Sequence, residues 1–198
     1  MRVLLASSLL AVSLATIAPA APVPTHLMPK EPPFAFPTKV GTTWVYEVEG
    51  KEKTLVISRS ENETGGTLVT TEWVIANGNR TPHMVISVTD KGVFLVTEDG
   101  VKYDERVCVL KLPHIKGQTW QANTSKPMPF IAIAGTKTAG PIERVKVPAG
   151  EFNAARVDSS FTFNGGLACE ATHWYAHGIG LVQLDDDLKL KSFKPGRD

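Results

Sequence analysis

The chain has 198 residues, with 21 Lys and Arg against 20 Asp and Glu, and a formal net charge of +1 at pH 7. This near-neutral balance argues against nucleic-acid binding, which requires a basic face. It also gives the protein no charge-based attraction to an anionic membrane surface. The length that follows the first 20 residues suits one domain with a sizeable core.

Residues 1–20 have the three parts of a secretory signal peptide. Arg2 supplies the positive start, Val3 to Ile17 is apolar, and Ala18-Pro19-Ala20 resembles a cleavage site. The apolar run is too short and too rich in Ala and Ser for a membrane span, although an uncleaved anchor is the alternative. No cysteine directly follows the cleavage site, so we expect no lipid anchor. We predict a secreted or periplasmic protein cleaved near Ala20, with no stable membrane span afterwards.

Residues 21–37 are predicted to form a proline-rich linker, and residues 38–198 a single β domain. The linker has little periodic pattern and contains Pro22, Pro24, Pro29, Pro32, Pro33 and Pro37, a composition typical of extended segments. Phe34 and Phe36 are apolar side chains of this stretch that could dock onto the domain.

Short alternating segments dominate the chain from Thr43 onward, with Gly, Asn or Asp at breaks about ten residues apart. We find no amphipathic helix after the signal segment. The predicted fold class is all-β: a curved antiparallel meander sheet, half-barrel or barrel-like, with little or no helix outside the signal peptide. The expected strands include 54–60, 67–75, 84–89, 93–97, 101–103, 106–112, 130–134 and 141–147, and Asp185-Asp186-Asp187 is expected to form a turn before a last strand.

One sequence segment occurs twice. The residues from Pro37 to Trp44 and from Pro113 to Trp120 share Pro, Gly, Thr and Trp in register. In each copy, the Gly would let the chain bend into an edge strand and the Trp would anchor it in the core. Duplication of two half-sheets and repeated use of one local solution both explain this match. The poor agreement of the flanking residues favours the second explanation.

Three turn motifs organise the C-terminal region, at residues 147–150, 164–166 and 177–180. Asn164-Gly165-Gly166 lies between two alternating runs and predicts a hairpin, because these residues readily adopt positive φ. In the second run, alternation places Leu167, Cys169, Ala171, His173 and Tyr175 on one face, and Ala168, Glu170, Thr172 and Trp174 on the other.

These motifs resemble a family of secreted bacterial domains of unknown function. Val147-Pro148-Ala149-Gly150-Glu151-Phe152 matches its VPAGxF signature, the residues from Trp174 to Val182 match WYAxGxGLV, and Gly41-Thr42-Thr43-Trp44 matches GxxW. Position 177 is often Pro in that family and is His177 here. The resemblance implies a curved antiparallel sheet, similar in outline to the half-barrels of LolA/LolB-like lipoprotein carriers. It implies no reaction and no catalytic residues.

Cys108 and Cys169 are the two cysteines of the chain. An exported protein lies in a compartment that permits disulfides. Both cysteines fall in predicted strands, so a disulfide between two neighbouring strands and a pair of buried free thiols are both open.

The sequence predicts no metal site, cofactor or catalytic residue. His173 and His177 are four residues apart in a strand-like segment, which separates them by roughly 13 Å, too far for one ion. Asp185-Asp186-Asp187 lacks the spacing of a calcium loop. Acidic side chains at Glu47, Glu49, Glu72 and Glu170 form no recognisable catalytic pair, and no nucleophile elbow or phosphate-binding loop occurs.

A set of aromatic residues could line the hollow of a curled sheet: Trp44, Tyr46, Trp73, Trp120, Phe161, Phe163, Trp174 and Tyr175. An ordinary core is the alternative use of these side chains. We predict an exported non-catalytic domain that binds a lipid, another apolar ligand or an envelope component in its concave face. The other hypotheses are a structural module whose partner is an envelope protein, and a hydrolase with a dispersed acidic site.

Overall fold

The computed structural model describes residues 34–123, 134–162 and 168–197. The predicted signal peptide, residues 21–33 of the linker, Phe163 and the Asn164–Gly166 turn lie outside the described residues.

The described residues are almost entirely antiparallel β-strand, as the sequence predicts. A single 3₁₀ turn, η2 (Ala76–Gly78), is their one helical element. None of them forms a helix long and apolar enough to cross a membrane. The strands are β1 (Thr43–Val48), β2 (Lys51–Glu63), β3 (Gly66–Val74), β4 (Arg80–Thr89), β5 (Gly92–Glu98), β6 (Val101–Lys111), β7 (Thr119–Gln121), β8 (Ala134–Val147), β9 (Gly150–Thr162), β10 (Ala168–Ala176), β11 (Gly180–Leu184) and β12 (Leu188–Lys194).

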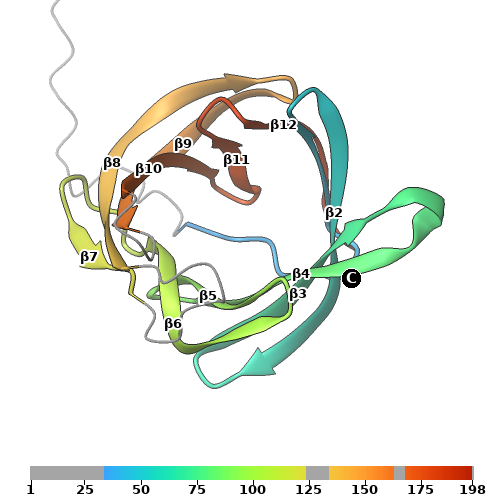
Figure 1. The fold of residues 1–198 in the computed structure, drawn as a ribbon, viewed down its shortest axis with the longest axis horizontal. Coiled ribbons are helices and arrows are strands. Elements are labelled where there is room, and N and C mark those ends of the chain that lie inside the picture. Colours follow the sequence, from blue (N-terminus) through green and yellow to red (C-terminus); the bar gives the residue numbers. More distant parts are fainter. Residues whose placement is uncertain (1–33, 124–133, 163–167, 198) are drawn as a thin grey trace, which may run out of the picture. The chain divides into compact units, whose positions relative to one another are not determined.

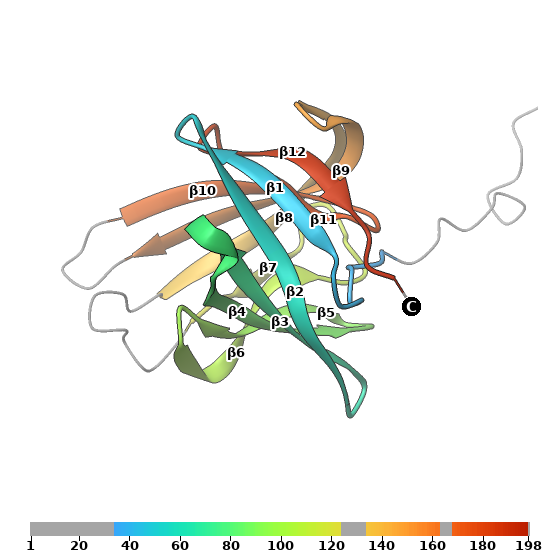
Figure 2. The ribbon, with the colours of Figure 1, turned by 90° about the vertical axis from the view of Figure 1, so that its right-hand side faces the viewer.

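These strands form one curled meander sheet (Figure 1). Its order is β6-β5-β4-β3-β2-β1-β12-β11-β10-β9-β8-β7, so consecutive strands pair except β6 and β7, and β1 also pairs with β12. Figure 2 shows β1 between β2 and β12. The sheet curls until its two edges, β6 and β7, approach each other, and the indole Nε1 of Trp120 donates a 2.9 Å hydrogen bond to the carbonyl oxygen of Cys108 there. The sheet is therefore nearly closed into a barrel.

Irregular pairing helps the sheet to curl. Register shifts occur in several strand pairs, including Val45/Tyr46 on β1 and Ala139/Ile142 on β8. Bulges of this kind bend a strand and increase its twist. The bulge on β8 contains Pro141, which has no backbone N–H to give to a ladder. The sequence predicts separate strands at 130–134 and 141–147. Residues 130–133 lie outside the described residues, and β8 runs from Ala134 through Pro141 without interruption.

The two copies of the repeated segment have the same local structure. Gly41 precedes β1 with φ 82° and donates its N–H to the Ile57 carbonyl on β2, and Gly117 precedes β7 with φ 85° and donates its N–H to the Ala139 carbonyl on β8. The next residue in each copy, Thr42 or Gln118, accepts the return bond from that same partner. One copy leads into β1–β6 and the other into β7–β12, the two halves of the described sheet. This placement favours duplication of a half-sheet over the local explanation that we preferred from the sequence.

Residues 34–36, which we call the docking segment, pack onto the turn between β10 and β11. The N–H of Ala35 donates to Nδ1 of His177 at 3.1 Å, and the Ala35 carbonyl accepts from the N–H of Gly178 at 2.7 Å. Phe36 lies against Gly180, where a Cβ atom would come within 2.9 Å of the ring. In Figure 1 the blue segment that precedes β1 runs across the opening that the strands surround. Docking of Phe34 and Phe36 therefore occurs, and it places the end of the predicted linker in the domain.

Candidate ligand cavity

The curled sheet lines a cavity of about 500 Å³ that is partly open to solvent. Voids in packed protein interiors rarely exceed the size of a water molecule, whereas small-molecule sites have volumes of roughly 300–1,000 Å³. Its wall is mainly apolar and includes Phe36, Leu55, Met84, Ile86, Val93, Leu95, Val107, Val109, Leu181, Leu184 and Leu188. The cavity therefore has the size and surface of a site for a small apolar ligand.

Five aromatic residues of the predicted set line this cavity: Trp44, Tyr46, Trp73, Phe161 and Tyr175. Trp120 is buried at the seam between the two sheet edges, and Phe163 lies outside the described residues. The structure thus brings most of the predicted aromatic set together around one hollow.

Trp44 and Tyr46 on β1 reach past β12 to the backbone near β11. The indole Nε1 of Trp44 donates to the Ile179 carbonyl at 2.7 Å, and the Tyr46 hydroxyl donates to the Leu181 carbonyl at 2.9 Å. Both side chains are almost fully buried. Burial strongly raises the pKa of the Tyr46 phenol, with Tyr175 as a second cause, so the hydroxyl stays a neutral donor. These bonds satisfy the polar atoms of the two rings and fix the rings in the cavity wall.

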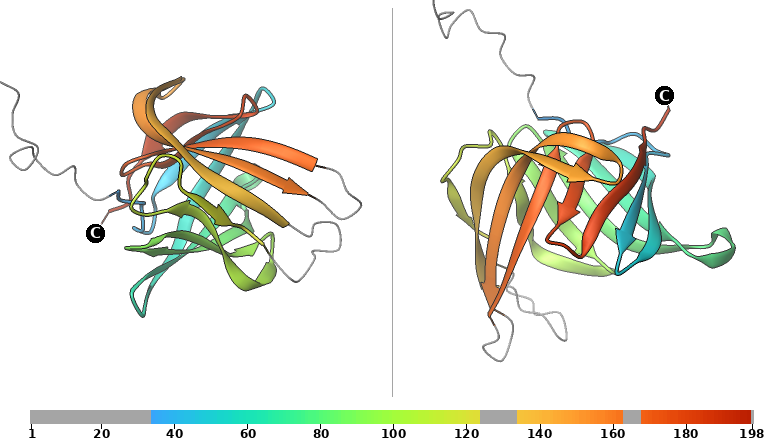
Figure 3. Two further views of the ribbon diagram at one scale, coloured as in Figure 1. Left: turned by 90° about the vertical axis from the view of Figure 1, so that its left-hand side faces the viewer. Right: turned by 90° about the horizontal axis from the view of Figure 1, so that it is seen from above.

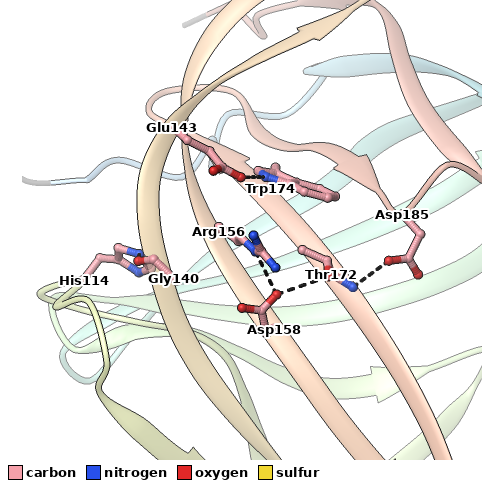
Figure 4. Close-up of polar contacts among 8 residues, drawn as sticks. All are labelled: His114, Gly140, Glu143, Arg156, Asp158, Thr172, Trp174 and Asp185. Atoms are coloured by element: carbon pink, nitrogen blue, oxygen red, sulfur yellow. Dashed lines mark hydrogen bonds and ion pairs between the residues drawn. The ribbon is translucent and has the colours of Figure 1, made fainter.

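Trp174 lies on the opposite face of β10 and takes no part in the cavity wall (Figure 4). Its Nε1 donates to Glu143 Oε1 at 2.7 Å, in a polar surface where Asp158 also accepts from Arg156 and Thr172. The strict alternation of β10 turns His173 and Tyr175 inward and Trp174 outward. This corrects the inclusion of Trp174 in the predicted aromatic set.

A polar cluster interrupts the apolar wall on β8, β9 and β10, the three strands that lie side by side in orange in Figure 3. Lys137 pairs with Ser159 across β8 and β9, and its Nζ donates to the Ser159 hydroxyl at 2.7 Å. His173 follows on β10, and all three residues line the cavity. We call Lys137, Ser159 and His173 the polar cluster.

The cavity environment changes the protonation of this cluster. Burial lowers the pKa of Lys137 to about 8, while Cys108, once its thiol is ionised, and the carboxylate of Glu98 act in the opposite direction. Burial, and then the like charge of Lys137, lowers the pKa of His173 to about 4. At pH 7 the lysine is therefore mostly charged and the imidazole is neutral.

The other ionisable residues of the wall are engaged elsewhere. Glu98 accepts a 2.6 Å hydrogen bond from the hydroxyl of buried Tyr103. His83 packs against Trp73 with ring centroids 4.6 Å apart and contacts Asp99 at 3.4 Å. Among the described residues, Glu98 is the sole carboxylate in the cavity wall, so the wall holds no acidic pair of the kind that glycoside hydrolysis needs.

Cys108 and Cys169 are free thiols. They lie on β6 and β10, which are not neighbours in the sheet, so the disulfide between adjacent strands that the sequence left open is absent. Burial raises the pKa of the Cys108 thiol to about 11, which keeps it protonated at neutral pH.

Within residues 34–123, 134–162 and 168–197, no three His, Cys, Asp or Glu side chains are placed to hold a metal ion. His173 lines the cavity, whereas His177 caps the docking segment. Residues 185–187 form the expected turn, in which Asp185 accepts from the Thr172 N–H at 2.7 Å.

Sequence reasoning missed the polar cluster. Lys137 fell between two expected strands, so its alternation within β8 was not considered. The signal that could have found His173 was present, because the alternation of β10 already grouped it with Tyr175 on one face. Only the pairing of β8, β9 and β10 brings the three side chains together.

Two solved structures resemble this chain. A candidate lipoprotein from Parabacteroides distasonis matches with a TM-score of 0.55 and 16% identity, over 83% of this chain and 100% of that one. A candidate exported protein with a YmcC-like fold from Bacteroides fragilis matches with a TM-score of 0.51 and 18% identity, over 82% and 99%. At these identities the likeness concerns the fold alone. No protein-family model and no curated protein sequence matches the chain.

Proposed function

We propose that this protein is an exported, non-catalytic binding protein that holds an apolar ligand inside its barrel-like sheet. The observation that carries the proposal is the cavity of about 500 Å³ with a mainly apolar wall. A domain that needed its aromatic residues only for stability would pack them together, because an empty apolar cavity costs free energy. This domain instead arranges five of them around a hollow.

The signal-peptide pattern of residues 1–20 and the exported or lipoprotein character named for the two structural neighbours support an extracellular or envelope location. The carrier-like outline that the sequence motifs imply agrees with a role in holding an apolar molecule away from water. Under this proposal the protein functions by holding the ligand within its curved sheet. Among the described residues, the wall holds neither a pair of carboxylates nor a reactive thiol.

A titration with the neutral fluorophore N-phenyl-1-naphthylamine tests this proposal. The purified protein should bind the probe saturably with enhanced fluorescence. Ala171→Phe places a large ring in the cavity wall and should weaken binding by about tenfold or more. Ala168→Phe, an exposed position on the same strand and the opposite face, is the matched control and should bind as the wild type does.

Two results would overturn the proposal: no saturable uptake by the folded wild-type protein, or equal binding by wild type and Ala171→Phe. The second result would place the probe on the outer surface. Circular dichroism of each variant establishes that the variant is folded before the comparison is made.

A further inference from the structure

Lys137 is an unusual member of the cavity wall. It is the one Lys or Arg among the described lining residues, and it lies among apolar and aromatic side chains. An ammonium group removed from water costs several kcal/mol unless it is paired with an anion. The lowered pKa of Lys137 reflects this cost.

The described part of the protein gives Lys137 no anionic partner at contact distance. Its ammonium group donates a hydrogen bond to the neutral hydroxyl of Ser159 at 2.7 Å. Glu98, the wall's carboxylate, acts on Lys137 only as a longer-range charge and is bonded to Tyr103. Residues 124–133 and 163–167, which the structure does not describe, contain no Asp or Glu in their sequence.

The neighbouring hydroxyl of the cluster can also serve an anion. The Ser159 hydroxyl accepts from Lys137 and keeps its own hydrogen for a second partner. Nδ1 of His173 is buried and has no hydrogen-bond partner among the described residues. The His173 ring already hydrogen-bonds the backbone of Val157, which engages the one N–H of the neutral imidazole, so an anionic head would take its donors from Lys137 and Ser159.

We infer that the ligand is a single-chain amphiphile with a carboxylate head, and that Lys137 and Ser159 bind this head while the aromatic wall holds the chain. This inference rests on the proposed function and specifies its ligand class. One ammonium matches the single charge of a carboxylate. A cavity of about 500 Å³ suits one acyl chain and is too small for the two chains and headgroup of a phospholipid.

The test measures how well hexadecanoic acid, 1-hexadecanol and hexadecyl phosphate displace N-phenyl-1-naphthylamine. The acid and the alcohol have the same chain, so the ratio of their affinities reports the head alone. This ratio is measured for wild type, Lys137→Met, Ser159→Ala and Lys146→Met. Lys146 is an exposed lysine on the same strand, which makes it the matched control.

Wild type and Lys146→Met should prefer the acid to the alcohol, and Lys137→Met should reduce this preference by about tenfold or more, as expected for a charge-assisted hydrogen bond. Ser159→Ala should reduce it by a smaller factor. Since both ligands are measured on the same variant, any effect of the substitution on the chain-binding wall cancels in the ratio.

The inference is overturned if wild type binds the alcohol as tightly as the acid, or if the preference survives in Lys137→Met. Tighter binding of the alkyl phosphate than of the acid overturns the assignment of a carboxylate head. In each of these cases binding of the neutral probe by the wild type leaves the proposed function standing. Failure of the wild type to bind the neutral probe, in contrast, overturns the proposed function itself.

Discussion

Trp120 and Cys108 join the two open edges of the sheet through one hydrogen bond. The indole Nε1 of Trp120 on β7 lies 2.9 Å from the carbonyl oxygen of Cys108 on β6. In the described residues β6 and β7 share no ladder, so this side chain occupies the place that backbone pairing would take in a closed sheet. At the opposite seam, where β1 meets β12, six residue pairs form a regular ladder with one bulge.

Removing the Trp120 bond should loosen the seam between β6 and β7. Trp120→Phe keeps an aromatic ring but leaves the Cys108 carbonyl without its donor, so we expect a loss of about 1–3 kcal/mol in the free energy of unfolding. Hydrogen exchange should accelerate in β6 and β7. Trp44→Phe is the control, because it also removes an indole bond, to Ile179. In Trp44→Phe, hydrogen exchange should accelerate near residues 177–181. The same pattern of accelerated exchange in both variants would contradict the assigned role of Trp120.

The docking segment should contribute both to stability and to ligand retention. Phe36 packs on Gly180 and lines the cavity. Phe36→Ala should lower the free energy of unfolding by about 1–3 kcal/mol and accelerate dissociation of the neutral probe. Val40→Ala, at a position that is 49% exposed, should change neither quantity. Stopped-flow fluorescence measures the dissociation, and an unchanged rate in Phe36→Ala would show that the segment does not cover the ligand.

Lys137 should lower the stability of the unliganded protein. Replacing an unpaired, partly buried ammonium with an apolar side chain of similar length should raise the free energy of unfolding at pH 7, by about 1–3 kcal/mol for Lys137→Met. Thermal unfolding in the absence of ligand measures this. A lower stability of Lys137→Met would mean that the lysine is held by a structural interaction and not kept for a ligand.

The same residue gives a signature at alkaline pH. The pKa of Lys137 is about 8 in the folded protein, below the ordinary lysine value of 10.5. Between these values the unfolded chain binds a proton that the folded protein does not, so the contribution of Lys137 to stability rises with pH. Cys108, Glu98 and His173 interact electrostatically with Lys137, and Cys108 titrates in the same range with the opposite effect on stability. Comparing the free energies of unfolding of wild type and Lys137→Met isolates the contribution of the lysine. The difference between these two free energies should become smaller from pH 8 to pH 10.5.

His173 should make the protein sensitive to acid. Its pKa is about 4 in the folded protein against an ordinary value of 6.5. Between these values the unfolded chain binds the extra proton, so stability falls as pH is lowered from 6.5 through 4. Over this pH range the free energy of unfolding of His173→Gln should fall by about 2 kcal/mol less than that of wild type. Lys137→Met should also lose less stability than wild type, but by a smaller amount than His173→Gln does, because the like charge of Lys137 is the second cause of the lowered pKa of His173. Urea unfolding at each pH measures both effects, and parallel curves for the three proteins would contradict the assignment.

Local patterns of the sequence predicted the strand-rich fold because turns and alternation are short-range properties. The breaks at Gly, Asn and Asp located most strands, and the alternation of residues 167–175 correctly opposed Trp174 to Tyr175. Grouping both in one aromatic site ignored that alternation. The predicted strand 141–147 begins at Pro141, whereas a bulge accommodates this proline within β8.

The cavity and its polar cluster depend on pairing between distant strands, which no local pattern encodes. Lys137 and Ser159 are 22 residues apart in the chain and meet only through the register of β8 and β9. The pairing of β1 with β12, which brings Trp44 and Tyr46 to the backbone at Ile179 and Leu181, is likewise a property of the whole sheet. The repeated Gly-containing segment was visible in the sequence, and its position at the start of each half of the sheet became clear only from the strand order.

Native mass spectrometry of the protein purified from an exported fraction tests the ligand cavity most directly. The account predicts a bound species with the mass of a fatty acid, which excess N-phenyl-1-naphthylamine displaces and which is absent from Ala171→Phe. A clean mass of the unliganded chain, together with no uptake of a fluorescent fatty acid by the folded protein, would contradict it.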